Sequence, residues 1–121
     1  MSLGKPDVRV RGAWEGRRFV QLVQIFLPVI WPDDPARFGS EVGSVVQELT
    51  GRFGGATSFL RGPAEGLWKD EDGTVERDAI VIVEVQVAEV SIPWWSALQA
   101  RLRRRFGQDE ILVRYHEVHA L

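Results

Sequence analysis

The residues best suited to chemistry lie in two β-branched segments of the second half of the chain. Arg114 and His116 alternate along the segment from residue 111 to 119, and Glu84 stands in the segment Ile80–Val87. An arginine, a histidine and a glutamate on one surface can bind an anion or move a proton near neutral pH. These three are the candidate catalytic residues. The competing explanation is a polar network that satisfies buried groups and fixes the register between two subunits.

Other polar and aromatic side chains are candidates for ligand binding. Gln24 and Gln86 are expected on the same sheet face as the catalytic candidates. Trp31 and Trp68 stand in or beside loops, where an indole can wall a pocket or cap the core. Trp94 precedes a second tryptophan on a predicted helix, about 100° away around its axis. Periodicity sends the second indole into the core and leaves Trp94 at a pocket lip or at the core edge.

Metal and cofactor chemistry finds no support in the residue pattern. The chain has no cysteine, so it has no thiolate ligand and no cysteine nucleophile. His116 and His119 are three apart on a predicted strand and therefore point to opposite faces. Asp70-Glu71-Asp72-Gly73 departs from the spacing of a calcium loop and is typical of a hairpin turn instead. We therefore expect neither a bound metal nor a cofactor.

Composition and charge narrow the class of protein. The 121 residues, 45% hydrophobic and 26% charged, suit a single globular domain. No apolar run reaches the roughly 18 residues that span a bilayer, and no apolar stretch follows the basic N-terminal residues as in a signal peptide. We expect no membrane association and a cytoplasmic location. The net charge of −2 and the absence of aromatic residues from Ile80–Val87 argue against nucleic-acid binding.

The first half of the chain predicts a strand followed by a helix. Phe19–Leu27 is β-branched and aromatic, and Pro28 ends its hydrogen-bond ladder. Asp33-Asp34-Pro35 is a typical helix start, and Gly54 with the next glycine is a typical helix end. The residues between them carry one apolar stripe at helical spacing: Phe38, Val42, Val45, Val46, Leu49 and Phe53.

The second half predicts two strands, a helix and a last strand. A strand begins at Ala56–Leu60 and resumes near Leu67–Trp68, and a returning strand covers roughly Thr74–Val87. A second helix runs from Ser91 to Gly107, with Pro93 in its first turn. The last strand is Ile111–His119. The buried stripe of the second helix is Trp95, Leu98, Leu102 and Phe106.

The order β-α-β-β-α-β predicts an α+β fold, a ferredoxin-like sandwich with a four-stranded antiparallel sheet and two helices on one face. The same tripeptide ends both predicted helices, as Arg52-Phe53-Gly54 and as Arg105-Phe106-Gly107. This short repeat fits a fold made of two similar halves. We assign residues 19–121 to this single domain. Residues 1–18 form an N-terminal extension or an edge strand.

The sheet face away from the helices is expected to carry apolar residues around a polar group. Strand alternation turns the valines of Ala79–Val87 toward the helices, with Ile111, Val113 and Tyr115 of the last strand. The open face then holds Val20, Leu22, Gln24, Phe26, Ile80, Ile82, Glu84, Gln86, Leu112, Arg114, His116 and Val118. Because a large apolar patch usually marks an interface, we expect a homodimer formed through this face.

The order of elements in residues 19–121 resembles the dimeric α+β-barrel proteins, a ferredoxin-like superfamily whose subunits pair their sheets. The stretches Arg52–Thr57, Gly66-Leu67-Trp68 and Asp70–Gly73 also resemble small bacterial proteins of no assigned role. The superfamily includes cofactor-free oxygenases, isomerases, haem enzymes and ligand-sensing domains, so the resemblance implies no catalytic residue. Three classes stay open: a small-ligand-binding protein or cofactor-free enzyme, a non-catalytic dimerisation module, and an RNA-binding sheet.

Overall fold

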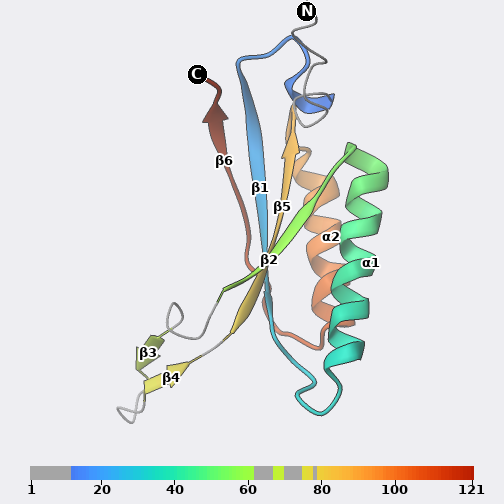
Figure 1. Ribbon diagram of the computed structural model, residues 1–121, viewed down its shortest axis with the longest axis vertical. Helices are drawn as coiled ribbons and strands as arrows, with labels where there is room; N and C mark the ends of the chain where they lie inside the picture. The colour runs from blue at the N-terminus through green and yellow to red at the C-terminus, as the bar shows by residue number, and fades with distance from the viewer. Residues whose placement is uncertain (1–11, 62–66, 70–74, 78) are drawn as a thin grey trace, which may run out of the picture.

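The computed structural model describes residues 12–61, 67–69, 75–77 and 79–121 (Figure 1). Its elements are a 3₁₀ turn η2 (Gly12–Trp14), strands β1 (Phe19–Pro28), β2 (Thr57–Arg61), β3 (Leu67–Lys69), β4 (Val75–Arg77), β5 (Ile80–Val87) and β6 (Val113–His119), and helices α1 (Pro35–Phe53) and α2 (Ile92–Arg105). The predicted turn at residues 70–73 and the first 11 residues of the predicted extension lie outside the described ranges.

Both helices begin and end where local chemistry favours it. The Asp34 side chain accepts a hydrogen bond from the Arg37 backbone N–H at 3.1 Å, and Pro35 occupies the first helical position of α1. Gly54 ends α1 in the left-handed conformation, with φ of 87°, and its N–H donates to the Thr50 carbonyl. The Ser91 side chain caps α2 by accepting from the Trp94 N–H.

The main sheet has four antiparallel strands in the order β2-β5-β1-β6, and α1 and α2 both lie on one side of it (Figure 1). This arrangement confirms the predicted ferredoxin-like α+β fold. A second, two-stranded ribbon pairs β3 with β4 and projects away from the main sheet. The strand expected over Thr74–Val87 is therefore two strands, β4 in the ribbon and β5 in the main sheet.

The core lies between the helices and the sheet. Odd-numbered residues of β1 and β5 meet the predicted stripes of both helices, as strand and helix periodicity require. Removing these side chains from water supplies the main favourable term in folding. The buried core cluster is Val23, Ile25, Leu27, Phe38, Val42, Val45, Leu49, Val81, Val83, Val85, Val87, Trp95, Leu98, Leu102, Phe106 and Ile111.

Two ion pairs join the outer surfaces of the helices. The Arg101 guanidinium donates to both carboxylate oxygens of Glu48, at 2.7 and 3.3 Å, and Arg105 pairs with Glu41. The hydrogen bond from Arg101 holds the pKa of the Glu48 carboxyl below its ordinary value. Because both side chains are largely exposed, the pair adds well under about 1 kcal/mol of stability. Arg101 and Arg105 of α2 thus link this helix to α1.

The even-numbered residues of β1, β5 and β6 that were predicted for the open face do lie on one side of the sheet. Gln24 of β1 stands opposite Glu84 of β5 and Arg114 of β6. Val20 and Ile82 on this face are already buried within the single chain, so the face is less bare than the sequence suggests. Tyr115 lies on the helix side but is half-exposed, because the helices do not cover this part of β6. None of the helices in the described ranges combines the length and apolar character that crossing a membrane requires.

Candidate functional site

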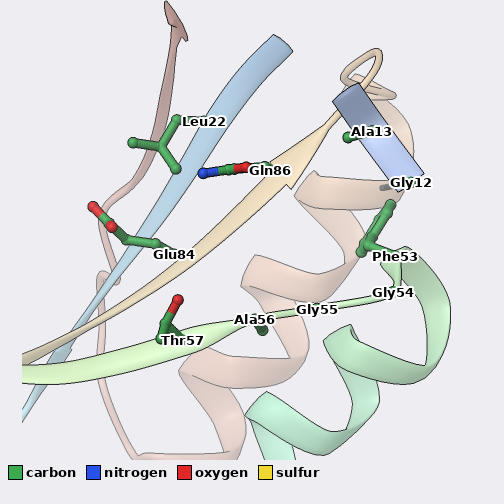
Figure 2. Close-up of a pocket in the computed structure, with 10 residues that line it drawn as sticks. All are labelled: Gly12, Ala13, Leu22, Phe53, Gly54, Gly55, Ala56, Thr57, Glu84 and Gln86. Carbon is green, nitrogen blue, oxygen red and sulfur yellow. The ribbon is translucent and has the colours of Figure 1, made fainter. Parts of the chain in front are cut away.

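The candidate site is a cavity of about 690 Å³ at the outer edge of β5. It lies where β2 begins at Thr57, next to the end of α1 and to η2 (Figure 2). Its volume is within the range of small-molecule sites in proteins. The lining residues are Gly12, Ala13, Leu22, Phe53, Gly54, Gly55, Ala56, Thr57, Glu84 and Gln86.

Glu84 is the one acidic side chain that lines the cavity among the described residues, and it is held by Gln24. The Gln24 Nε2 donates to Glu84 Oε2 at 2.7 Å, and the Gln24 Oε1 accepts from Arg114 Nε at 2.9 Å. Gln24 is only 7% exposed, so its amide is fixed between an acceptor and a donor. The chain Arg114–Gln24–Glu84 leaves the second oxygen of Glu84 available to a ligand.

No lysine or arginine within the described ranges forms an ion pair with Glu84. Arg114 reaches it only through the Gln24 amide, and its guanidinium lies 4.7 Å from the centre of the Phe26 ring. A half-buried carboxylate without a cationic neighbour attracts positive charge, because burial weakens its solvation. The cavity therefore offers a place for a cationic or hydroxyl-bearing group.

Gln86 is the second polar wall. The Trp14 indole Nε1 donates a hydrogen bond to Gln86 Oε1, which links η2 to β5 across the cavity mouth. Since that oxygen is occupied, the Gln86 Nε2 is the end that remains free to donate. Figure 2 shows the side chains of Glu84 and Gln86 on the same side of β5, beside Leu22. One strand thus presents an acceptor and a donor two residues apart.

Phe53 supplies the aromatic wall at the end of α1. Its ring stacks on Trp95 with centroids 5.2 Å apart and meets Trp94 edge-on at 5.2 Å. Arg52 lies over the Trp94 ring, 4.4 Å from its centroid. The buried Trp95 anchors this cluster to the core, so Phe53 is held in place as a rigid surface for a ligand.

The sequence candidates separate into two groups. Glu84, Gln24, Gln86 and Arg114 come together at or beside the cavity, as their shared sheet face predicts. His116 lies opposite Leu22 on the edge strand, and its exposed side chain makes no hydrogen bond to a described residue. The structure therefore does not join His116 to the Glu84–Arg114 chain.

Trp31 and Trp94 are not among the residues that line the cavity. Trp31 stacks on Phe106 and packs edge-on against Phe38, where it closes the far end of the core. Trp94 touches the cavity only through Phe53. The backbone of Trp68 belongs to β3, but its side chain is outside the part of the chain that is described.

In the described ranges, no group of three or more His, Asp or Glu side chains gathers as metal ligands would. His119 instead pairs with Glu117 on its own strand, at 2.7 Å. The expectation of no metal or cofactor stays a prediction, since it concerns the whole chain.

Comparison with known proteins gives structural neighbours and no sequence relatives. No family model matches the chain, and no curated protein matches it. The chain is similar in structure to a phage SAM lyase solved in complex with S-methyl-5'-thioadenosine, with a TM-score of 0.53, 16% identity, and coverage of 99% of this chain and 97% of that one. The same kind of enzyme in its apo state gives 0.50 and 15%, with coverage of 98% and 97%. At this identity the likeness shows the fold.

Several cavity residues were not singled out from the sequence. The sequence pattern places Phe53 in the core stripe and Gly55 at a helix end. Thr57 and Trp14 carried no signal of their own, because their roles depend on long-range contacts with β5. The one available signal was the second glycine after α1. A single glycine suffices to end a helix, so a second one suggests that space is needed there.

Proposed function

We propose that this protein binds a small ligand in the cavity at the edge of β5, and that the ligand is S-adenosylmethionine or a related adenosine thioether. The observation that carries the proposal is Glu84, a half-buried carboxylate in a concave site with no cationic partner among the described residues. The similarity in fold to a SAM lyase over nearly the whole chain makes this ligand class the first to test.

The sulfonium of S-adenosylmethionine is a positive charge that Glu84 can stabilise. Two unit charges about 4 Å apart near a protein surface attract by roughly 4 kcal/mol before desolvation is subtracted. The Gln24 hydrogen bond fixes the carboxylate, and Arg114 fixes the Gln24 amide. Arg114 is thus a positioning residue in this proposal, whereas Glu84 contacts the ligand.

The enzymatic form of the proposal is cleavage of the bond between the sulfur and the amino-acid carbon chain. The substrate's own carboxylate oxygen bonds to that carbon as the C–S bond breaks, and the sulfur keeps the electron pair, so the products are S-methyl-5'-thioadenosine and a lactone. Relief of the sulfonium charge accompanies that step, so a carboxylate beside the sulfur orients the substrate more than it drives departure. Incubation with S-adenosylmethionine, followed by chromatography for the thioadenosine, separates an enzyme from a binding protein.

The direct test compares S-adenosylmethionine with S-adenosylhomocysteine, which lacks the methyl group and the positive charge. We expect the unaltered protein to prefer the sulfonium compound by roughly tenfold, a difference of about 1.4 kcal/mol. Glu84→Gln keeps the size and the Gln24 contact but removes the charge, so the two dissociation constants should become similar. Isothermal titration calorimetry measures both.

Glu48→Gln is the matched control, because Glu48 lies on the outer surface of the helices and pairs with Arg101. It should leave the preference unchanged. If neither compound binds the unaltered protein at millimolar concentration, the proposed ligand class is wrong. If Glu84→Gln retains the preference, Glu84 is not the group that recognises the charge.

A homodimer formed through the open sheet face is the second proposal, and it also covers the alternative of a non-catalytic interaction module. Phe26 is half-buried on this face, and Leu112 beside it is 53% exposed. Apolar side chains of this size are stabilised when a second copy covers them. The cavity opens toward the same face through Leu22 and Glu84, so assembly there also shields the ligand.

Leu112→Glu should convert the dimer to a monomer, since it places a charge in the covered patch. Light scattering coupled to size exclusion should report about half the mass of the unaltered protein. Ile92→Glu is the control, because Ile92 is equally exposed, at 54%, but lies on α2. A monomeric unaltered protein, or a dimer that survives Leu112→Glu and dissociates with Ile92→Glu, rules out this face.

A further inference from the structure

Among the described residues, the outer edge of β5 has no strand partner where it borders the cavity. β2 pairs with β5 from Arg61 opposite Ile80 to Thr57 opposite Glu84, where the pairing ends. The last residues of β5, Val85–Val87, continue beyond that point, paired with β1 on their other side. We call this three-residue segment the free edge of β5. The cavity lies directly against it, lined by Gln86, Gly54 and Gly55.

The main chain of Gln86 points outward from the free edge. In an antiparallel pair, successive residues turn their N–H and C=O groups to opposite neighbours. The Phe26 N–H donates to Leu112 and the Val29 N–H to Ala79, so odd-numbered residues of β1 face β5. Their partners in β5 are also odd-numbered. The even-numbered Glu84 and Gln86 therefore face the β2 side.

At Glu84 this outward pair of groups meets Thr57, but at Gln86 it meets the cavity. No main-chain hydrogen bond joins Gln86 to any other described residue on that side. A backbone N–H and C=O that have no protein partner are bound by water or by a ligand. The free edge thus offers one donor and one acceptor from a single residue. Their geometry is the one with which a strand edge binds a neighbouring strand.

The gap beside Gln86 suits a small planar group better than an additional strand. β2 closes one end at Thr57, and η2 closes the other, where Ala13 lines the cavity and Trp14 bonds Gln86. A strand would need several unpaired residues in a row, and in the described part of β5 Gln86 is the one outward-facing residue beyond the pairing with β2. The two glycines leave room beside the edge, and Phe53 gives an aromatic surface next to it.

We propose that the free edge of β5 reads the adenine base of the ligand: the Gln86 N–H donates to a ring nitrogen, and the Gln86 C=O accepts from the exocyclic amino group. Adenine presents an acceptor directly beside a donor, which complements one residue of a strand edge. This inference rests on the proposed function, because it assumes an adenosine ligand. It adds that recognition of the base is made by the main chain.

The first measurement needs no ligand. Amide hydrogen exchange followed by NMR on the full chain should show the Gln86 N–H exchanging at least about tenfold faster than the Glu84 N–H, which is paired with Thr57. Addition of S-methyl-5'-thioadenosine should slow the Gln86 exchange and move its amide resonance downfield. A Gln86 amide already protected in the free protein overturns the inference, whatever the ligand does.

The second measurement compares S-methyl-5'-thioadenosine with S-methyl-5'-thioinosine. The hypoxanthine base of thioinosine has a carbonyl where adenine has its amino group, so an acceptor faces the Gln86 carbonyl and the hydrogen bond to that carbonyl is lost. A bidentate contact of this kind discriminates by about 1–3 kcal/mol, or roughly 5- to 150-fold in dissociation constant. We expect the thioinosine to bind more weakly within that range.

Gln86→Ala distinguishes the main chain from the side chain. It removes the amide that bonds Trp14 but keeps the N–H and C=O of the free edge, so the preference for adenine should persist even if both affinities fall. Equal binding of the two nucleosides by the unaltered protein, or loss of the preference in Gln86→Ala, overturns the inference and leaves the proposed function standing. If neither nucleoside binds the unaltered protein, both the inference and the proposed function are wrong.

Discussion

Gly55→Leu is expected to weaken binding of S-adenosylmethionine by about 5- to 150-fold or to abolish it. Gly55 lines the cavity and is two residues before Thr57, whose neighbour Glu84 lies on the open face. In an extended segment, residues two apart share a side, so a side chain at position 55 projects toward the ligand. A Cβ there meets no atom within 4 Å, and the backbone is not in the left-handed region. The protein should therefore fold normally with the cavity filled.

The loss of affinity follows from the reduced volume of the cavity. A leucine side chain occupies space that the ligand needs, and overpacking of this kind costs about 1–3 kcal/mol or excludes the ligand altogether. Gly43→Leu is the matched control, because Gly43 is exposed on α1 and is absent from the cavity lining. Calorimetric titration should give unchanged affinity for Gly43→Leu. Unchanged affinity for Gly55→Leu would place the ligand elsewhere.

Phe106→Ala is expected to lower the free energy of unfolding by about 3–5 kcal/mol. Phe106 is 1% exposed and stacks on Trp31 at 5.8 Å, with Phe38 meeting its ring edge-on at 6.2 Å. It follows the last residue of α2 and closes the end of the core farthest from the cavity. Removing the ring leaves a void that its two aromatic neighbours, Trp31 and Phe38, cannot fill. Domains of this size have roughly 5–15 kcal/mol in total, so this loss is a large share of the stability.

Urea denaturation followed by tryptophan fluorescence, at one fixed protein concentration, measures this loss. Fixed concentration matters, because assembly adds to apparent stability by mass action. Phe19→Ala is the comparison: Phe19 is 45% exposed and contacts His119 at the edge of the sheet. It should cost under about 1 kcal/mol. Similar losses for the two variants would mean that the Trp31–Phe38–Phe106 cluster does not close the core.

The fold could be predicted because its signals are local. Asp34, Pro35 and Gly54 act within a few residues of the helix ends they define, and the valines of β5 alternate without interruption. The divided returning strand could not be anticipated, because β4 and β5 differ in pairing partner rather than in residue type. Tyr115 was placed on the correct side of β6, but the extent of helix cover depends on packing angles that periodicity does not contain.

The site was predictable only where strand parity sufficed. Alternation along β5 predicts the face of Glu84, but β1 is apolar on both sides, so the sequence leaves the face of Gln24 ambiguous. The register confirms the choice of the open face and makes Gln24 and Glu84 direct neighbours. The contact of Trp14 with Gln86 spans 72 residues and has no counterpart in any local pattern. His116 shares the face with Arg114 but lies two residues further along β6, opposite Leu22 and not opposite Gln24. The local sequence does not show which residues of neighbouring strands lie opposite one another, because the register depends on the pairing of the whole sheet.

A crystal structure of the protein grown with S-methyl-5'-thioadenosine tests the central claim most directly. We predict the nucleoside in the cavity between Phe53 and Glu84, with its base against Gln86 and its ribose or sulfur toward the carboxylate. Occupancy of a different surface, or a cavity filled flush by side chains of a second copy, would contradict the assignment of this cavity as the ligand site.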